Sequence, residues 1–252
     1  MKKSNILITS YLTIVFIIVS LLLPGCGNNK DEKVIILGTS LDYPPFEFSQ
    51  GGTAVGFDIE VANALAQELG YQLEIKDIDF PGLIPALKSG RVDFVMAGLS
   101  ENEERKKNVD FSNSYYEGDV NVLLHLKDKS FKSIDEASDK KIGTQQGSVQ
   151  EAYLKELKET IPTIEIVALG RNPNLVQEVK IGRIDALIIS ETQAKKFIEA
   201  NPDLSYSPIE STQADIAIAL KKGSELTKKV NEALKKLDDE GILQKLKSKW
   251  FK

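Results

Sequence analysis

The sequence predicts an α/β protein made of two lobes, each with a mostly parallel sheet. From Val34 onward, short apolar runs typical of buried strands alternate with segments that have helical spacing. One sequence pattern occurs twice, about one small domain apart. The 252 residues and the hydrophobic content of 42% are enough for two such cores.

The repeated pattern is the clearest sign of two similar halves. Lys88 to Val95 reads KSGRVDFV, and Lys180 to Leu187 reads KIGRIDAL, 92 residues later. Each copy predicts a helix end, a glycine stop, an arginine and then a buried strand whose second residue is aspartate.

The remaining elements follow from periodicity and from stop signals. Helices are expected where apolar residues recur every three or four positions, and strands where they alternate or run together. The expected strands are 34–37, 73–78, 92–96, 120–126, 141–144, 164–168, 184–189 and 215–220. The expected helices are 56–69, 83–88, one that starts near Ser100, one that ends near Lys158, and 172–181, 191–200, 224–240 and 242–251.

Polar and small residues follow several of the predicted strands. They are Ser40, residues 97–100, residues 145–148, and Ser190 with Glu191. In open α/β sheets, ligands bind beyond the carboxyl ends of the strands. Because two of these loops come from each half, we expect a ligand between the halves. Glu117-Gly118-Asp119 is the candidate hinge.

The stretch from Met96 to Lys107 has the features of an anion site. Ala97 and Gly98 leave the backbone open, and Ser100 with Glu103 forms a capping-box pattern that predicts a helix start. Arg105 follows in the first turns, and arginine can hold a carboxylate through two parallel hydrogen bonds. The alternative is that Arg105 belongs to a solvated basic helix face with Lys106 and Lys107.

Two other segments have both a structural and a functional interpretation. The aromatic, proline-rich run from Tyr43 to Phe48 can supply buried rings or one wall of a pocket. Asp58 and Glu60 lie in the first turn of a helix, where the helix dipole favours acids, so a structural use is the leading interpretation for both.

Composition excludes several function classes. A formal charge of −5 argues against a nucleic-acid partner, which needs a basic surface. His125 is the only histidine and Cys26 the only cysteine, so we expect no histidine-pair metal site, no disulfide and no cofactor.

The N-terminus predicts export. Lys2 and Lys3 precede an almost wholly apolar run from Ile6 to Leu23, which is typical of a signal peptide over residues 1–25. The segment 26–33 is polar and is expected to be a tether. Either cleavage before Cys26 or an uncleaved membrane anchor places the remainder outside the cytoplasm.

Several segments together resemble a known family. They are Gly56-Phe57-Asp58-Ile59-Glu60-Val61, Tyr-Pro-Pro-Phe-Glu-Phe from Tyr43, Leu-Ile-Pro-Ala-Leu-Lys-Ser-Gly-Arg-Val-Asp from Leu83, and Glu-Arg-Lys-Lys-Asn-Val-Asp-Phe-Ser from Glu104. From about Val34 to Phe251, the chain is similar to the bacterial extracellular solute-binding proteins for polar amino acids. Leu23-Pro24-Gly25-Cys26 resembles the lipobox of bacterial lipoproteins, which implies lipid attached to Cys26.

This resemblance implies a two-lobed periplasmic binding protein type 2 fold with a two-strand hinge. Residues 34–117 and 215–252 would form the first lobe, and residues 118–214 the second. It also implies roles in binding an amino acid. Arg105 and Ser100 match the α-carboxylate site, Ala97 and Gly98 the backbone edge beside it, Tyr43 and Phe80 the aromatic walls, and Gln145, Ser148 and Val149 the closing residues of the second lobe.

The partner of the ligand's α-amino group is left open. The family usually has aspartate where this chain has Ser190, and some members have aspartate at Ser40. A buried ammonium without a carboxylate is costly. Glu191 is the favoured substitute, Glu47 and Glu117 are others, and a ligand that is not a standard α-amino acid is the remaining alternative.

The resemblance implies a binding protein for an amino-acid ABC importer. Its partners would be a free amino acid, permease subunits and, through lipid, a membrane; we expect a monomer without nucleic acid. The acidic mature chain, about −7 by charge counting, favours arginine or glutamine. The alternative is an enzyme of the same fold, a dehydratase or lyase using Glu191, Glu47 or His125. A sensing module would normally carry a membrane-spanning or signalling domain.

Overall fold

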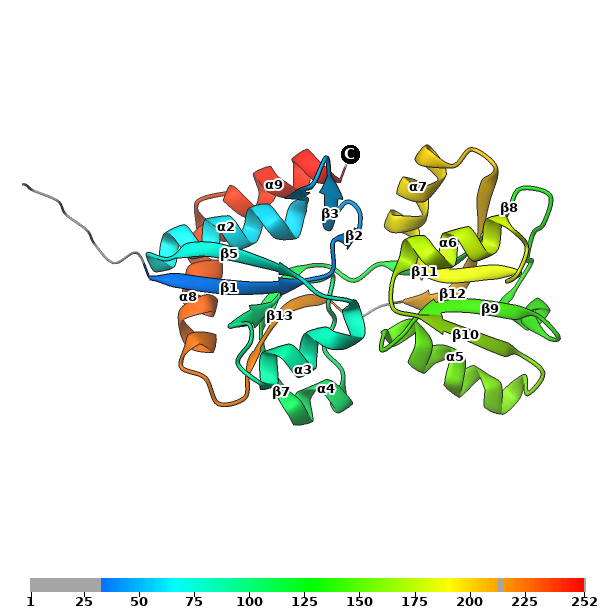
Figure 1. Ribbon diagram of the computed structural model, residues 1–252, viewed down its shortest axis with the longest axis horizontal. Coiled ribbons are helices and arrows are strands. Elements are labelled where there is room, and N and C mark those ends of the chain that lie inside the picture. The colour runs from blue at the N-terminus through cyan, green and yellow to red at the C-terminus, as the bar shows by residue number, and fades with distance from the viewer. Residues whose placement is uncertain (1–32, 213–214, 252) are drawn as a thin grey trace, which may run out of the picture. The chain divides into compact units, whose positions relative to one another are not determined.

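The computed structural model describes residues 33–212 and 215–251. The predicted signal peptide, Cys26 and most of the predicted tether lie outside these described residues. The described chain contains two five-stranded sheets and one three-stranded sheet, and Figure 1 shows their strands and the surrounding helices. Both larger sheets belong to one compact unit, residues 33–252. The predicted two-lobed α/β fold is confirmed.

We call the first five-stranded sheet and the helices packed on it lobe 1. Its strand order is β5-β1-β6-β13-β7. Strand β1 pairs in parallel with β5 and β6, whereas β13 runs antiparallel to β6 and β7. The strands are β1 (Val34–Thr39), β5 (Gln72–Asp77), β6 (Phe94–Val95), β7 (Val109–Tyr116) and β13 (Ile216–Lys221), and the small sheet has β2 (Asp42–Tyr43), β3 (Glu47–Gln50) and β4 (Thr53–Val55). The helices are α2 (Phe57–Leu69), η1 (Phe80–Gly82), α3 (Leu83–Lys88), α4 (Glu103–Asn108), α8 (Leu226–Asp239) and α9 (Ile242–Trp250).

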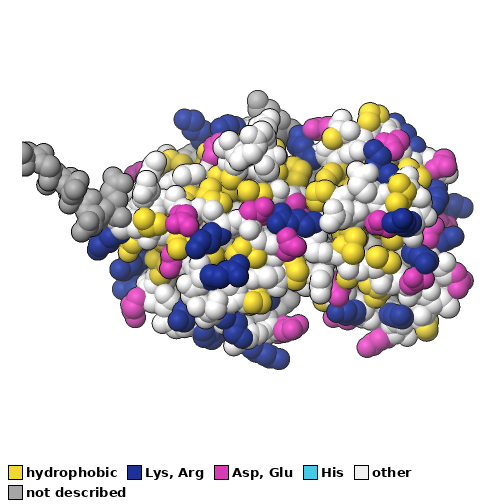
Figure 2. Space-filling view, in the orientation of Figure 1, with side chains coloured by type: hydrophobic (Ala, Val, Ile, Leu, Met, Phe, Trp, Pro, Cys, Tyr) yellow, Lys and Arg dark blue, Asp and Glu magenta, His cyan; other side chains and the backbone are white. Residues whose placement is uncertain are grey.

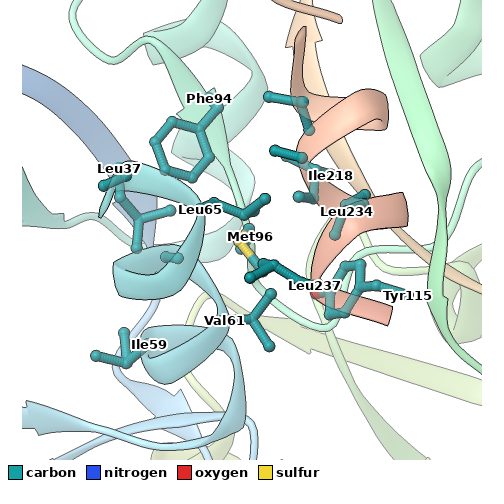
Figure 3. Packing of buried hydrophobic residues seen from close by; sticks show 14 of the residues in the cluster. Leu37, Ile59, Val61, Leu65, Phe94, Met96, Tyr115, Ile218, Leu234 and Leu237 are labelled. Atoms are coloured by element: carbon teal, nitrogen blue, oxygen red, sulfur yellow. The ribbon is translucent and has the colours of Figure 1, made fainter. Parts of the chain in front are cut away.

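Both faces of this sheet are covered, which explains its nearly continuous apolar strands. Phe94 of β6 points into a cluster with α2, α8 and α9, while the next residue, Val95, joins a second cluster with α3. Figure 3 shows the first cluster, where Leu65 of α2 lies near Leu234 and Leu237 of α8. The C-terminal helices α8 and α9 therefore pack on this sheet together with α2.

Lobe 2 is the second five-stranded sheet with its helices. The strand order is β10-β9-β11-β8-β12, with β9 parallel to β10 and β11, and β8 antiparallel to β11 and β12. Alternate residues of β8 again enter different clusters, Val122 with α6 and Leu123 with α5. The elements are β8 (Val120–Leu126), η2 (Ile134–Ala137), β9 (Lys141–Gln145), α5 (Val149–Thr160), β10 (Glu165–Leu169), α6 (Asn172–Lys180), β11 (Ala186–Ser190), α7 (Glu191–Ala200) and β12 (Leu204–Thr212).

The repeated sequence pattern forms the same structure in both lobes. The Asp93 side chain accepts a hydrogen bond from the Ile36 backbone N–H at 2.7 Å, on neighbouring strand β1. The Asp185 side chain accepts one from the Lys141 N–H at 3.0 Å, on neighbouring strand β9. Each aspartate thus ties the start of the strand that follows it to the strand alongside.

Several details differ from the expectations. The three strands of the small sheet, β2, β3 and β4, were not expected, and neither were β7 and β12. The strand expected at 92–96 is shorter, at Phe94–Val95. The lobe boundaries proposed at 117/118 and 214/215 stay predictions. No helix within the described ranges is long and apolar enough to cross a membrane. Figure 2 shows acidic and basic side chains interspersed on the face it presents.

Candidate functional site

Arg105 is a buried cation held by backbone oxygens. Only 8% of its surface is exposed. Its guanidinium donates to the Ser100 carbonyl within lobe 1 and, at 2.9 Å, to the Gly147 carbonyl of lobe 2. No carboxylate within residues 33–212 and 215–251 forms an ion pair with it. Burial lowers the pKa of Arg105 to about 10. An anion bound here would supply the charge that the two carbonyl groups lack.

The helix that carries Arg105 starts differently from the expectation. Asn102, not Ser100, is the N-cap of α4, and its side chain accepts from the Arg105 N–H at 2.8 Å. The capping-box interpretation of Ser100 was therefore wrong. Ser100 instead supplies the carbonyl oxygen that the guanidinium contacts.

The lobe 1 wall joins two aromatic rings to a glycine edge. Gly98 has a φ of +53°, and a Cβ built there would lie 2.7 Å from Cε1 of Tyr43, so the close approach of the ring requires glycine. The Phe80 ring centroid lies 5.5 Å from the Arg105 guanidinium carbon, a cation–π distance.

The lobe 2 wall is the turn from β9 into α5. Ser148 is the N-cap of α5, and its hydroxyl accepts from the Glu151 N–H at 3.1 Å. Gln150, which was not predicted, lies in the first turn, and its amide donates to Asn121 at 3.1 Å. Gln150 could have been predicted as a site residue, because it directly follows Val149 at the start of the helix.

These two walls enclose one small cavity. Nine predicted residues and Gln150 line it, and its volume is about 20 Å³, roughly the space for one water molecule. Since an amino acid is larger, the lobes must separate to admit it. The lining residues are Tyr43, Phe80, Ala97, Gly98, Ser100, Arg105, Gln145, Ser148, Val149 and Gln150.

Three predicted residues lie outside that lining. Ser40 is buried in lobe 1, and Ser190 caps helix α7, where its hydroxyl accepts from the Tyr43 hydroxyl at 3.0 Å. Glu191 accepts from the Tyr206 hydroxyl at 2.7 Å and pairs with Lys195 at 3.2 Å. Its pKa is lowered, mainly by the Tyr206 hydrogen bond. The structure therefore does not bring Glu191 into the cavity.

The other acid–base candidates also lie away from it. His125 is 2% exposed, and its ring nitrogens contact the Leu126 carbonyl and the Ser207 hydroxyl, both at 2.8 Å. Glu117 lines a different surface pocket. Within the part of the chain that the structure describes, no group of three histidine, cysteine, aspartate or glutamate side chains is suited to a metal ion.

Lobe 1 contains three buried acids, Asp42, Glu47 and Asp58. Desolvation raises the pKa of Asp42 to about 6. Desolvation and the nearby Asp58 raise the pKa of Glu47 well above its ordinary value. Asp58 also has a raised pKa because of burial, although hydrogen bonds from Gly98 and Tyr115 oppose the rise.

A second set of contacts between the lobes was missed from the sequence. Arg171 of lobe 2 bonds Asp79 at 2.6 Å and Asp77 at 3.0 Å. The next residue, Asn172, donates its backbone N–H to Asp42 at 2.9 Å. Since Arg171 gives α6 no side-chain cap, Asp42 of lobe 1 takes that role. We call these contacts the Arg171 clasp.

Comparisons with known proteins identify the family and the fold. A family model described as bacterial extracellular solute-binding proteins, family 3, matches residues 35–252. The arginine-binding extracellular protein ArtP of Bacillus subtilis is 44% identical over 230 residues, which is 89% of each chain. An ancestral arginine-binding protein solved with arginine has a TM-score of 0.83 and 35% identity, covering 88% of this chain and 99% of that one. An ancestral arginine-binding protein solved with glutamine has a TM-score of 0.82 and 35% identity, covering 87% and 98%.

Proposed function

The chain belongs to the bacterial extracellular solute-binding proteins of family 3, and on that premise we propose that it delivers L-arginine to an ABC importer, with Arg105 on the α-carboxylate. It is an amino-acid-binding protein of this transporter class. The observation that carries the proposal is the Arg105 guanidinium, buried at a cavity between the lobes and partnered by carbonyl oxygens.

Closure follows from the same contacts. A carboxylate bound to Arg105 would also lie near Ser148 and Val149 at the start of α5, in the opposite lobe. Backbone N–H groups at a helix start favour an anion. The ligand therefore makes part of its contacts only when the lobes meet, and this difference in affinity shifts the population toward the closed state that a permease can recognise.

Arginine is preferred to glutamine for two reasons. ArtP and an ancestral relative are both named as arginine-binding proteins. Tyr43 and Phe80 line the cavity as well, and aromatic faces attract a guanidinium more strongly than a neutral amide. An ancestral relative was also solved with glutamine, so glutamine is the second ligand to test.

The test is a thermal-shift screen of the twenty amino acids, followed by calorimetry with L-arginine. We expect L-arginine to give the largest rise in melting temperature, and small-angle scattering to show compaction. Arg105→Ala should abolish both responses. Lys107→Ala changes an exposed cation of the same helix and should respond like the wild type. A normal response of Arg105→Ala would refute the carboxylate role.

The proposed role includes no chemical step. The lining residues contain no carboxylate and no imidazole, the groups most often used for general acid–base catalysis. L-Arginine recovered unchanged after incubation, by mass spectrometry, supports a binding protein. Conversion to another carboxylic acid would favour the dehydratase or lyase alternative.

We also propose that the protein acts outside the cytoplasm as a monomer anchored through lipid on Cys26. The lipobox-like sequence that ends at Cys26 supports the lipid anchor, and Cys26 itself lies outside the described residues. Labelled palmitate should be incorporated into the wild type and not into Cys26→Ala, which should leave the membrane fraction. Equal labelling of the two proteins would contradict the anchor.

A further inference from the structure

The cavity lining carries a single formal charge, that of Arg105. An α-amino acid brings a carboxylate, which Arg105 matches, and an ammonium, which no lining residue matches with a carboxylate. Glu191 is engaged by Tyr206 and Lys195. An ammonium enclosed without a countercharge loses much of its solvation energy. A negative charge close behind the wall would remove this difficulty.

Asp58 lies directly behind the lobe 1 wall. It is fully buried at the start of α2, and its carboxylate accepts from the Gly98 N–H at 3.0 Å and from the Tyr115 hydroxyl at 2.8 Å. Gly98 lines the cavity. One peptide group therefore separates the carboxylate from the ligand space.

The orientation of the Ala97–Gly98 peptide allows the Asp58 charge to act on the cavity. In a trans peptide the N–H and C=O groups point in opposite directions. Because the Gly98 N–H points to Asp58, the Ala97 carbonyl points away from Asp58, and both residues line the cavity. A carboxylate on the N–H polarises the peptide and makes its carbonyl oxygen a stronger acceptor.

The surroundings of Asp58 favour its charged form over that of its neighbour Glu47. Glu47, on β3, is completely buried. Among the described residues, neither of its carboxyl oxygens has a hydrogen-bond partner. Burial and the two neighbouring acids Asp58 and Asp42 raise the pKa of Glu47 well above its usual range. Asp58 has two donors that stabilise its anion. One proton on Glu47 and one charge on Asp58 is the arrangement that these contacts support.

We propose that Asp58 is the countercharge for the ligand's α-ammonium and acts through the Ala97–Gly98 peptide. This inference rests on the proposed function, because it needs a ligand with an α-amino group. Asp58 is a positioning residue, since it contacts the wall and not the ligand. By fixing Gly98 it also fixes the surface against which the Tyr43 ring packs.

The test compares L-arginine with 5-guanidinopentanoate, which has the same guanidinium and carboxylate and lacks the α-amino group. Asp58→Asn keeps an oxygen for the Gly98 N–H and removes the charge. We expect calorimetry to show L-arginine binding weakened by about tenfold, as loss of a charge one peptide away predicts, and the analogue changed by less than about twofold. Equal weakening of both ligands, or no weakening of L-arginine, overturns the proposal.

Two controls keep the outcome decisive. Glu60→Gln makes the same chemical change in the first turn of α2, at a residue that pairs with Lys249, and should alter neither affinity. Arg105→Ala should weaken both ligands. If it does not, the proposed carboxylate site fails, whatever Asp58 does.

A second variant serves if Asp58→Asn does not fold. Tyr115→Phe removes one of the two donors to Asp58 and leaves the Gly98 contact. L-Arginine binding should then fall by about threefold to fivefold, as loss of one hydrogen bond to a charged group predicts, while binding of the analogue should stay within about twofold. Equal responses to the two ligands overturn the proposal here too.

Discussion

The two lobes begin alike and differ where their central strands end. Strand β6 in lobe 1 and strand β11 in lobe 2 follow the same glycine–arginine pattern, and each is preceded by an aspartate that holds the neighbouring strand. At the end of these strands, Gly98 occupies the position that Ser190 occupies in lobe 2, 92 residues later. The repeated part supports the sheet, and the segments after it carry the site.

The segment after each strand explains why only lobe 1 carries the candidate anion site. In lobe 2, β11 runs directly into α7, with Ser190 as the N-cap. In lobe 1, residues 96–102 separate β6 from α4, and this loop leaves space for a ligand edge and for Arg105 on the next helix. In lobe 2 the strand is followed at once by a capped helix. In lobe 1 the longer connection, residues 96–102, makes room for the candidate anion site.

The largest expected effect tests whether the repeated cores are equivalent. Leu83 on α3 and Leu175 on α6 hold matching positions, with 1% and 0% exposure. Each change to alanine should cost about 2–5 kcal/mol of unfolding free energy, because it leaves a cavity in a packed core. Urea denaturation measures both. A cost below about 1 kcal/mol at one site only would show that the two cores are not equivalent.

The next effect concerns the cap that α6 takes from lobe 1. The α3 helix has no side-chain cap, whereas Asp42 caps α6 across the interface. The folded-state pKa of Asp42, about 6, exceeds its ordinary value of 3.8, so the folded protein holds this proton more tightly than the unfolded chain. The Asp42 carboxyl therefore adds to the free energy of unfolding at low pH, and this contribution is lost as pH rises from about 4 to about 6. The free energy of unfolding falls by up to about 3 kcal/mol over that range.

The measurement is urea denaturation of the wild type and of Asp42→Asn at about pH 4 and about pH 7. The stability of the wild type relative to Asp42→Asn should decrease at the higher pH. A difference between the two proteins that is independent of pH would contradict the raised pKa.

A third experiment exchanges the matched strand ends. Gly98→Ala adds a Cβ beside the Tyr43 ring in a left-handed conformation, so it should cost about 2 kcal/mol of stability and weaken L-arginine binding at least about tenfold. Ser190→Ala removes the α7 cap and should cost about 1 kcal/mol, with L-arginine binding changed by less than about threefold. Calorimetry and thermal denaturation give both numbers. Equal losses of affinity would remove the distinction between the two strand ends.

The smallest effect belongs to the Arg171 clasp. Arg171→Ala removes two partly exposed ion pairs between the lobes, each worth about 0.2–1 kcal/mol. The ligand-free protein should become less compact in small-angle scattering, and L-arginine affinity should fall about twofold to fivefold. Arg183→Ala removes an exposed pair with Glu178 inside lobe 2 and serves as the control. Identical scattering of the two variants would show that the clasp does not affect closure.

Much of the fold and of the candidate site could be predicted because it depends on local sequence. The alternation of α3, β6 and α6, β11 follows from periodicity and glycine stops, and the segments that carry Arg105 and Ser148 follow strand ends. The roles of individual residues within the cavity came from the family resemblance, which periodicity alone does not supply.

The rest depends on contacts between distant segments. Asp58 and Gly98 are 40 residues apart, and Arg171 and Asp79 are 92 apart. Neither pair has a local pattern, since acids at a helix start and arginines beside a helix are common on any surface. The choice of Asn102 over Ser100 as the cap is a competition between two good capping residues, which propensity does not decide.

Strand β13 has a consequence for synthesis. It lies between β6 and β7 and pairs with both, although it follows the whole of lobe 2 in the chain. While the ribosome is still adding lobe 2, the first sheet lacks its bridging strand and the helices that follow it. The first sheet is therefore completed only after the whole of lobe 2 has been translated, so lobe 1 cannot reach its final fold before lobe 2 has been made.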